Sequence, residues 1–144
     1  MLVGQHKHKL DDKSRLSLPA KFRRELGQTV IITHGLDQCL FVYPLSEWKN
    51  FSTAISELSM GQADTRAFTR FMLSSAVEVD IDKSGRILIP DHLRQYADLE
   101  EQVIVAGVHN RLELWGHDAW EEYMGNVTKR ADNLAERLGE IGML

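Results

Sequence analysis

Two short stretches of the chain repeat the same pair of charged residues, an aspartate followed four positions later by an arginine. Asp11 and Arg15 form the first pair, and Asp82 and Arg86 form the second. Two carboxylates can share a proton and activate water, as in an aspartic-protease dyad. Here a basic neighbour beside each carboxylate lowers its pKa and removes its use as a general acid. The sequence therefore predicts a protein that is not an enzyme.

No other catalytic arrangement accompanies these pairs. The sequence contains no Ser-His-Asp or Cys-His arrangement in a recognisable context, no Gly-rich phosphate loop and no metal motif. We accordingly expect no cofactor, no bound metal and no small-molecule substrate.

The same pairs are better suited to binding a polyanion. An aspartate that bonds the backbone of its own turn, or pairs with the arginine, would hold the loop rigid. Lys13 with Arg15, and Lys83 with Arg86, would then face a phosphate backbone or guanine edges, where arginine can bond bidentately. A structural Asp–Arg clasp that only stabilises a surface turn is the alternative. Because the motif occurs at equivalent places twice, binding is favoured.

The two pairs belong to a longer internal repeat. Residues 11–23 align with residues 82–94 without a gap, and the identical residues are the aspartate, the arginine, a proline and a final arginine. After one inserted residue, Gly35, Leu40 and Trp48 match Gly107, Leu112 and Trp120. We expect two units of about 45 residues each, 5–49 and 77–120.

Each unit is expected to contain four short strands and one short helix, which makes the fold class α+β. In the second unit the predicted elements are, in order, a strand over 76–81, a turn over 82–85, a strand over 86–89, a helix over 90–97 and strands over 103–105 and 111–115. The Asp-x-x-x-Arg loop lies at the tip of a hairpin in this arrangement.

Helical segments are predicted between the units and after them. Apolar residues at three- and four-residue spacing indicate a helical connector over 50–76, broken near 60–62, with Ser46 as a plausible N-cap. The same spacing continues through 121–144 and predicts one amphipathic C-terminal helix. Its apolar stripe must be covered by the body of the protein or by another subunit.

Charge is distributed unevenly along the 144 residues. The chain has a net charge of -4, but residues 1–28 carry +4 and the remaining 116 residues carry -8. A basic segment on an acidic body is a hint of a polyanion-binding face. No apolar run is long enough for a membrane span, no signal peptide is evident, and Cys39 is the only cysteine, so we expect a cytoplasmic protein.

One other pair could bind a ligand. His6 and His8 alternate along a predicted strand and would lie on one face, which could seed a metal site. Two ligands are insufficient for zinc, so a half-buried or interface histidine pair is favoured.

Several of these features together resemble a known family. The doubled loop followed by a strand and a proline, the helix over 19–26 with its equivalent from Pro90, and Tyr43-Pro44-Leu45-x-x-Trp48 are similar to the MraZ family of bacterial transcriptional regulators, over about residues 1–125. The resemblance implies two tandem AbrB-like units that interlock into an intramolecular, pseudo-dimeric swapped-hairpin barrel.

The resemblance also implies a function. MraZ proteins assemble into homo-oligomeric rings and bind direct repeats in the promoter of the division and cell wall gene cluster, which includes their own gene, chiefly as repressors. Double-stranded promoter DNA is the implied partner, and a nucleoid-associated location follows.

The family's site residues can be carried over by position. The DNA-binding residues are expected to be Lys13, Arg15, Lys83 and Arg86, and the loop-structuring residues Asp11, Ser14, Asp82 and Gly85. Ser14 stands where the family usually has glycine. A serine with positive φ costs about 1 kcal/mol, so we expect the two loops to differ in shape.

Two alternatives remain open. One is an AbrB-fold antitoxin-like module that binds a partner protein through its helical extensions and binds DNA only secondarily. Antitoxins of this fold usually carry one DNA-binding unit and a disordered tail, whereas this chain has two units and a helical tail. The other is a structural ring with no nucleic-acid partner.

Overall fold

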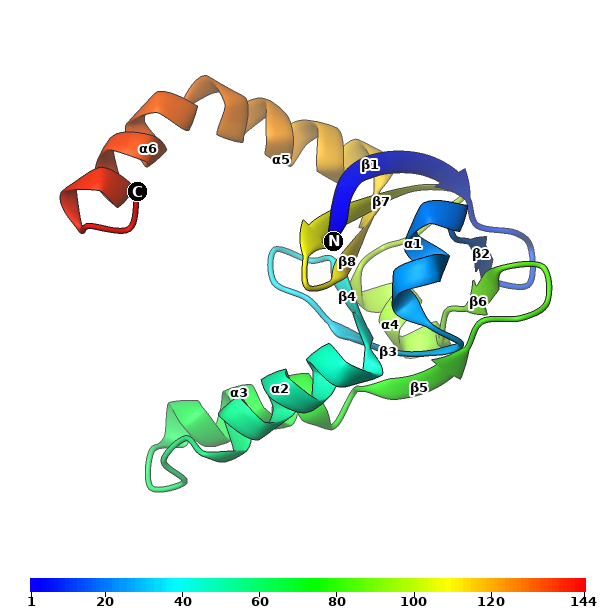
Figure 1. Ribbon diagram of the computed structural model, residues 1–144, viewed down its shortest axis with the longest axis horizontal. Helices are drawn as coiled ribbons and strands as arrows, with labels where there is room; N and C mark the ends of the chain where they lie inside the picture. The colour runs from blue at the N-terminus through cyan, green and yellow to red at the C-terminus, as the bar shows by residue number, and fades with distance from the viewer.

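The computed structural model describes residues 1–144, and both repeats follow the same course in it (Figure 1). The first unit contains β1 (Leu2–Lys9), β2 (Arg15–Ser17), α1 (Ala20–Leu26), β3 (Thr29–His34) and β4 (Leu40–Pro44). The second contains β5 (Val77–Asp80), β6 (Arg86–Leu88), α4 (Asp91–Tyr96), β7 (Gln102–His109) and β8 (Leu112–Gly116). The predicted order of two strands, a short helix and two strands is confirmed in both.

Strands of the two units are interleaved. The six-stranded antiparallel sheet has the order β1-β7-β8-β4-β3-β5, so the first strand of each unit pairs with a strand of the other. β1 pairs with β7 over its whole length, from Leu2 opposite His109 to Lys9 opposite Gln102. β2 and β6 form a separate two-stranded ladder. Neither unit therefore completes its strand pairing from its own residues.

The six-stranded sheet is open. β1 and β5 lie at the two ends of the strand order and each has one neighbour in the sheet. The closed barrel implied by the family resemblance is therefore not confirmed.

One hydrophobic core underlies both units. Its cluster of 19 buried side chains draws on both repeats. Leu16 and Ile87 are paired in the β2–β6 ladder and are fully buried, and so are Phe22 on α1 and Leu93 on α4. Burial of such a side chain contributes roughly 1.5–3 kcal/mol. The two loops that precede β2 and β6 thus stand on a common core.

The connector between the units forms a pair of helices, α2 (Leu45–Ser56) and α3 (Ala63–Leu73), with the predicted break between them. They contribute to a second buried cluster, which contains Cys39, Phe41, Tyr43, Ile55, Met72, Ile104 and Trp115. The predicted N-cap is wrong, because Ser46 lies in the first turn of α2 and Pro44 occupies the cap.

All three prolines of the chain precede a helix in this way. Pro19, Pro44 and Pro90 are the N-cap residues of α1, α2 and α4. Proline suits this place because its φ is fixed near -65° and its missing N–H leaves no donor unpaired.

The C-terminal segment is not the single helix that was predicted. It forms α5 (His117–Lys129) and α6 (Ala131–Glu140), because the backbone of Arg130, at φ -120° and ψ 17°, leaves the helical range. Trp120 anchors the start of α5 by packing against Trp115 and by donating a 2.8 Å hydrogen bond to Gln5. Neither helix buries a residue, and α6 extends away from the sheet (Figure 1). No helix of the protein is both long enough and apolar enough to cross a bilayer.

Because both units share one core, shortening a buried side chain at the centre of the β2–β6 ladder should lower the free energy of unfolding strongly. Ile87→Ala should lower the free energy of unfolding by about 2–5 kcal/mol, because it leaves a cavity between the units. Leu88→Ala, in the same strand but 55% exposed, should change it by no more than about 0.5 kcal/mol. Urea unfolding of both variants provides the measurement, and equal costs would contradict the common core.

Candidate nucleic-acid interface

The first Asp-x-x-x-Arg loop is organised by its aspartate. Oδ1 of Asp11 accepts hydrogen bonds from the backbone N–H groups of Lys13 and Arg15, both at 2.9 Å. Oδ2 accepts a third bond from Nε of Arg15, also at 2.9 Å. The backbone closes the loop as well, because the N–H of Ser14 donates to the carbonyl of Asp11 at 3.0 Å. One carboxylate therefore fixes both the loop backbone and the arginine side chain.

The second loop has the same hydrogen bonds. Oδ1 of Asp82 accepts from the N–H groups of Ser84 and Arg86 at 2.9 Å, and Oδ2 accepts from Nε of Arg86 at 3.0 Å. The N–H of Gly85 donates to the carbonyl of Asp82 at 2.9 Å. The geometry agrees with the first loop bond for bond.

This agreement overturns the expectation that the loops differ in shape. Ser14 has φ 58° and its counterpart Gly85 has φ 79°, so both take the left-handed conformation. The serine bears the conformational cost of about 1 kcal/mol, and the three bonds to Asp11 hold it there. Sequence could identify the cost, but not that the loop would accept it without changing shape.

The hydrogen bonds also explain the charge state of the two aspartates. Their pKa values lie below the ordinary 3.8, in each case first because of the backbone N–H of the arginine and then because of its side chain, while partial desolvation opposes the shift. Both carboxylates are thus held ionised, as acceptors for the loop rather than as proton donors.

The β2–β6 ladder brings the two loops together. Leu16 and Ile87 point into the core, so alternation along the strands places Arg15 and Arg86 on the outer face. Two further backbone bonds cross between the units, from the N–H of Leu18 to the carbonyl of Gly85 at 2.9 Å and from the N–H of Ile89 to that of Ser14 at 2.8 Å. Each loop is therefore hydrogen-bonded to the other unit through the carbonyl of its residue with positive φ, Ser14 or Gly85.

The predicted basic residues gather on this face. Nη1 of Arg86 lies 4.0 Å from Oδ2 of Asp11, which already binds Arg15, so the two arginines converge on one carboxylate. Both side chains are about one-third exposed, and the Nη groups of Arg15 make no hydrogen bond within the chain. In Figure 1 the loops form the edge of the molecule opposite the projecting helices.

The two lysines are exposed but are not equivalent. Lys13 aligns with Ser84 and donates its own N–H to the loop carboxylate, whereas Lys83 aligns with Asp12 and does not. The two loops have the same hydrogen bonds, but the lysine is the third residue of the first loop and the second residue of the second loop. The charge differs as well, because residues 11–15 have two acidic and two basic residues, whereas residues 82–86 have one acidic and two basic residues.

The repeat also marks Arg23 and Arg94, to which spacing alone assigns no role. Arg23 lies against Gly85, so it contacts the loop of the opposite unit. The only sequence signal for such a contact is that the arginine recurs at the same distance from both loops.

The remaining candidate features lie apart from this face. His6 and His8 are half-buried on one side of β1 as expected, and the pKa of His8 is lowered by desolvation and then by His6. No group of three or more His, Cys, Asp or Glu side chains that could hold a metal is present.

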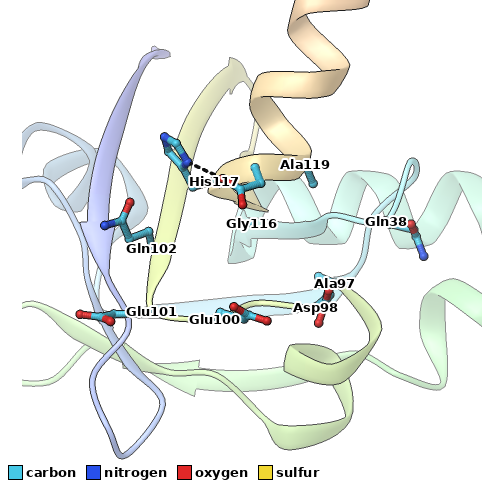
Figure 2. Close-up of a pocket in the computed structure, with 10 residues that line it drawn as sticks. Gln38, Ala97, Asp98, Glu100, Glu101, Gln102, Gly116, His117 and Ala119 are labelled. Carbon is cyan, nitrogen blue, oxygen red and sulfur yellow. Dashed lines mark hydrogen bonds and ion pairs between the residues drawn. The ribbon is translucent and has the colours of Figure 1, made fainter.

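A cleft of about 420 Å³ lies between the turn after α4 and the start of α5 (Figure 2). Its lining includes four carboxylates, those of Asp98, Glu100, Glu101 and Asp118. None of the four predicted DNA-binding side chains lines it. An acidic lining repels phosphate groups, so this cleft is unsuited to nucleic acid.

The lowered pKa values predict an acid-dependent loosening of the loops. The bonds to Asp11 and Asp82 stabilise the fold fully above the ordinary pKa of 3.8 and are lost as the pH falls through the lower, folded values. In an NMR titration, the amide shifts of Arg15 and Arg86 should change with midpoints below 3.8. Asp82→Asn should abolish the transition in the second loop alone, and a midpoint at or above the ordinary value would refute the assignment.

Comparison with known proteins agrees with the doubled architecture. A family model described as "MraZ protein, putative antitoxin-like" matches residues 1–71 and again residues 72–139. A protein of Thermoanaerobacter sp. (strain X514), named transcriptional regulator MraZ, is 49% identical over 143 residues, covering 99% of this chain and all of that protein.

Two further relatives carry the same name. That of Moorella thermoacetica is 46% identical over 138 residues, with 96% of each chain covered, and that of Acetivibrio thermocellus is 44% identical over 143 residues, covering 99% of this chain and all of the relative. These names describe regulators and not enzymes, in agreement with the prediction from the loop residues. With one family model matching twice along the sequence and relatives similar over their full length, the chain belongs to the MraZ family.

Proposed function

We propose that this protein is a sequence-specific, DNA-binding transcriptional regulator that contacts promoter DNA through its two Asp-x-x-x-Arg loops. The observation that carries the proposal is the convergence of Arg15 and Arg86 on one rigid outer face. The name of the relatives, transcriptional regulator MraZ, supports the same role.

The loops have the properties that a DNA contact requires. A two-stranded ribbon fits the major groove of B-DNA, which is about 12 Å wide. The β2–β6 ladder supplies such a ribbon, and Asp11 and Asp82 restrain its arginines through Nε. Free Nη groups can then bond guanine edges bidentately, while Lys13 and Lys83 contact phosphates.

The charge of the rest of the protein limits how strongly one copy binds. The whole chain has a net charge of -4 and residues 29–144 carry -8, so most of the surface repels DNA. We propose that a homo-oligomeric ring compensates, because several weakly binding copies that engage direct repeats together gain affinity through avidity. The interleaved units act as a pseudo-dimer in each copy, because the first strand of each unit pairs with a strand of the other.

The projecting helices support assembly. α5 and α6 bury no residue within the chain, and two large apolar side chains, Leu138 on α6 and Ile141 at its C-cap, are exposed. Exposed apolar stripes of this kind are normally covered by another subunit. By resemblance, the regulated promoter is that of the division and cell wall gene cluster with its own gene, the effect is repression, and the site of action is the cytoplasmic nucleoid.

A second candidate is protein binding of the antitoxin type, which the family description itself mentions. A mostly apolar groove of about 300 Å³ lies between the C-terminal end of α2, the following turn and α3. It is lined partly by Ile55, Leu58 and Met60 and could accept a partner chain. In that case loss of the loop arginines would leave the principal interaction intact.

The DNA-binding proposal predicts a charge-specific loss of affinity. Arg15→Ala or Arg86→Ala should weaken binding to a promoter fragment by about 5- to 150-fold, since a lost bidentate contact costs about 1–3 kcal/mol. In titrations at several salt concentrations, Lys13→Ala or Lys83→Ala should show a smaller salt dependence, because each lost phosphate contact reduces the slope by about 0.9. Arg70→Ala on α3, which is exposed and lies outside both the loops and α6, removes the same charge and should bind normally. Unchanged binding by both loop variants would exclude these loops as the site.

The assembly proposal predicts a separable effect. Leu138→Asp should reduce the particle size in light scattering, because it places a charge on the apolar stripe of α6. It should weaken binding to several direct repeats but leave binding to a single repeat almost unchanged. Arg15→Ala should have the opposite pattern, with normal size and weak binding. Normal size in Leu138→Asp would exclude this stripe as a subunit interface.

A further inference from the structure

Arg23 extends from α1 of the first unit onto the loop of the second. A methyl group added at Gly85 would lie 2.5 Å from Nη1, 2.7 Å from Cζ and 2.9 Å from Cδ of Arg23. These distances are far inside van der Waals contact, so the arginine side chain occupies the space that a side chain at residue 85 would need. Gly85 is buried as a result, whereas Lys83 and Ser84 beside it are exposed.

The contact is one of packing. Arg23 forms no ion pair with any carboxylate of the chain, and its Nε is buried without a hydrogen-bond partner. Its planar guanidinium can cover the flat backbone at a glycine, which an ammonium on a flexible stem cannot do.

Arg94 is the counterpart of Arg23 in the repeat and shares the buried, unpaired Nε. Its Nη2 lies 3.8 Å from Asp91, an ion pair that Arg23 lacks. The loop on which each arginine would act also differs, because Ser14 carries a side chain where Gly85 has none. The guanidinium that packs on a loop backbone is thus that of Arg23, and the loop is the second one.

We propose that Arg23 is a positioning residue for the second DNA-binding loop, which it holds in its bound shape from the opposite unit. The inference rests on the proposed function of that loop. In addition to burying Phe22 and Leu26 in the core, α1 would then hold the second loop in place. The geometry of Arg86 would depend on Arg23, which lies 63 positions away in the sequence. A side chain at position 85 would have to displace this covering arginine and would also have to adopt φ 79°.

The first test does not involve DNA. In Arg23→Ala and Arg23→Lys, amide hydrogen exchange at Gly85 and Arg86 should accelerate by about three- to tenfold, because the cover that restrains the loop is lost. Exchange at Val30 in β3 should stay constant, which separates a local effect from general destabilisation. Arg24→Ala provides the matched control, since Arg24 is the exposed neighbour on the same helix and carries the same charge.

The second test separates positioning from direct contact with DNA. Binding of a promoter fragment should weaken by about three- to tenfold in both Arg23 variants, with the salt dependence of the wild type, because no phosphate contact is lost. Gly85→Ala should reproduce the loss by displacing Arg23.

Three results would overturn the inference. If amide hydrogen exchange at Gly85 is unchanged in Arg23→Ala, the arginine side chain does not restrain the loop. Normal binding by Arg23→Lys together with a salt slope smaller by about 0.9 in Arg23→Ala would show that the residue is a direct phosphate contact. Accelerated exchange with unchanged DNA affinity would show that the packing serves stability alone. If the wild-type protein bound no promoter DNA at any salt concentration, the proposed function would fail, while the exchange data would still decide whether Arg23 braces the loop.

Discussion

The crossing of β2 and β6 is the constraint on which the rest of the structure depends. At its centre Leu16 and Ile87 are buried against each other, and at its ends the carbonyls of Ser14 and Gly85 accept backbone bonds from the opposite unit. This short ladder joins the two halves of the core and places both loops on one face. A shift of one residue in its register would turn the buried pair outward and the arginines inward.

The loop carboxylates connect this framework to charge. Each aspartate accepts two backbone bonds and one side-chain bond from its own loop, and the side-chain bond takes Nε and not a terminal nitrogen of the arginine. A structural Asp–Arg clasp is therefore compatible with an arginine that binds a ligand. The clasp holds the arginine in a defined direction, and less conformational entropy is then lost when a ligand is bound.

Much of this could be predicted from sequence because the repeat is strong. The strand and helix order, the helix break near residues 60–62 and the turn at Asp82 follow from alternation, proline and glycine. The interleaving could not be derived from these local patterns, since hydrophobic alternation defines a strand and its faces but not its neighbour. The break at Arg130 and the role of Pro44 as N-cap were missed for a similar reason, because an uninterrupted apolar stripe and a nearby serine are compatible with either outcome. Arg23 could be identified as repeated, but its contact with Gly85 exists only once the units have crossed.

The pairing of the first strand also determines when the protein can fold. Leu2 pairs with His109, so β1 has no partner in the sheet until β7 has been synthesised and has left the ribosome. At about 5–20 residues per second, the first strand waits roughly 5–20 s after it is made. During that interval β2, β3 and the apolar side of α1 also lack their partners from the second half, and they are open to contact with other nascent chains. Productive folding is therefore delayed until β7 has been made, and the first half alone cannot complete the sheet.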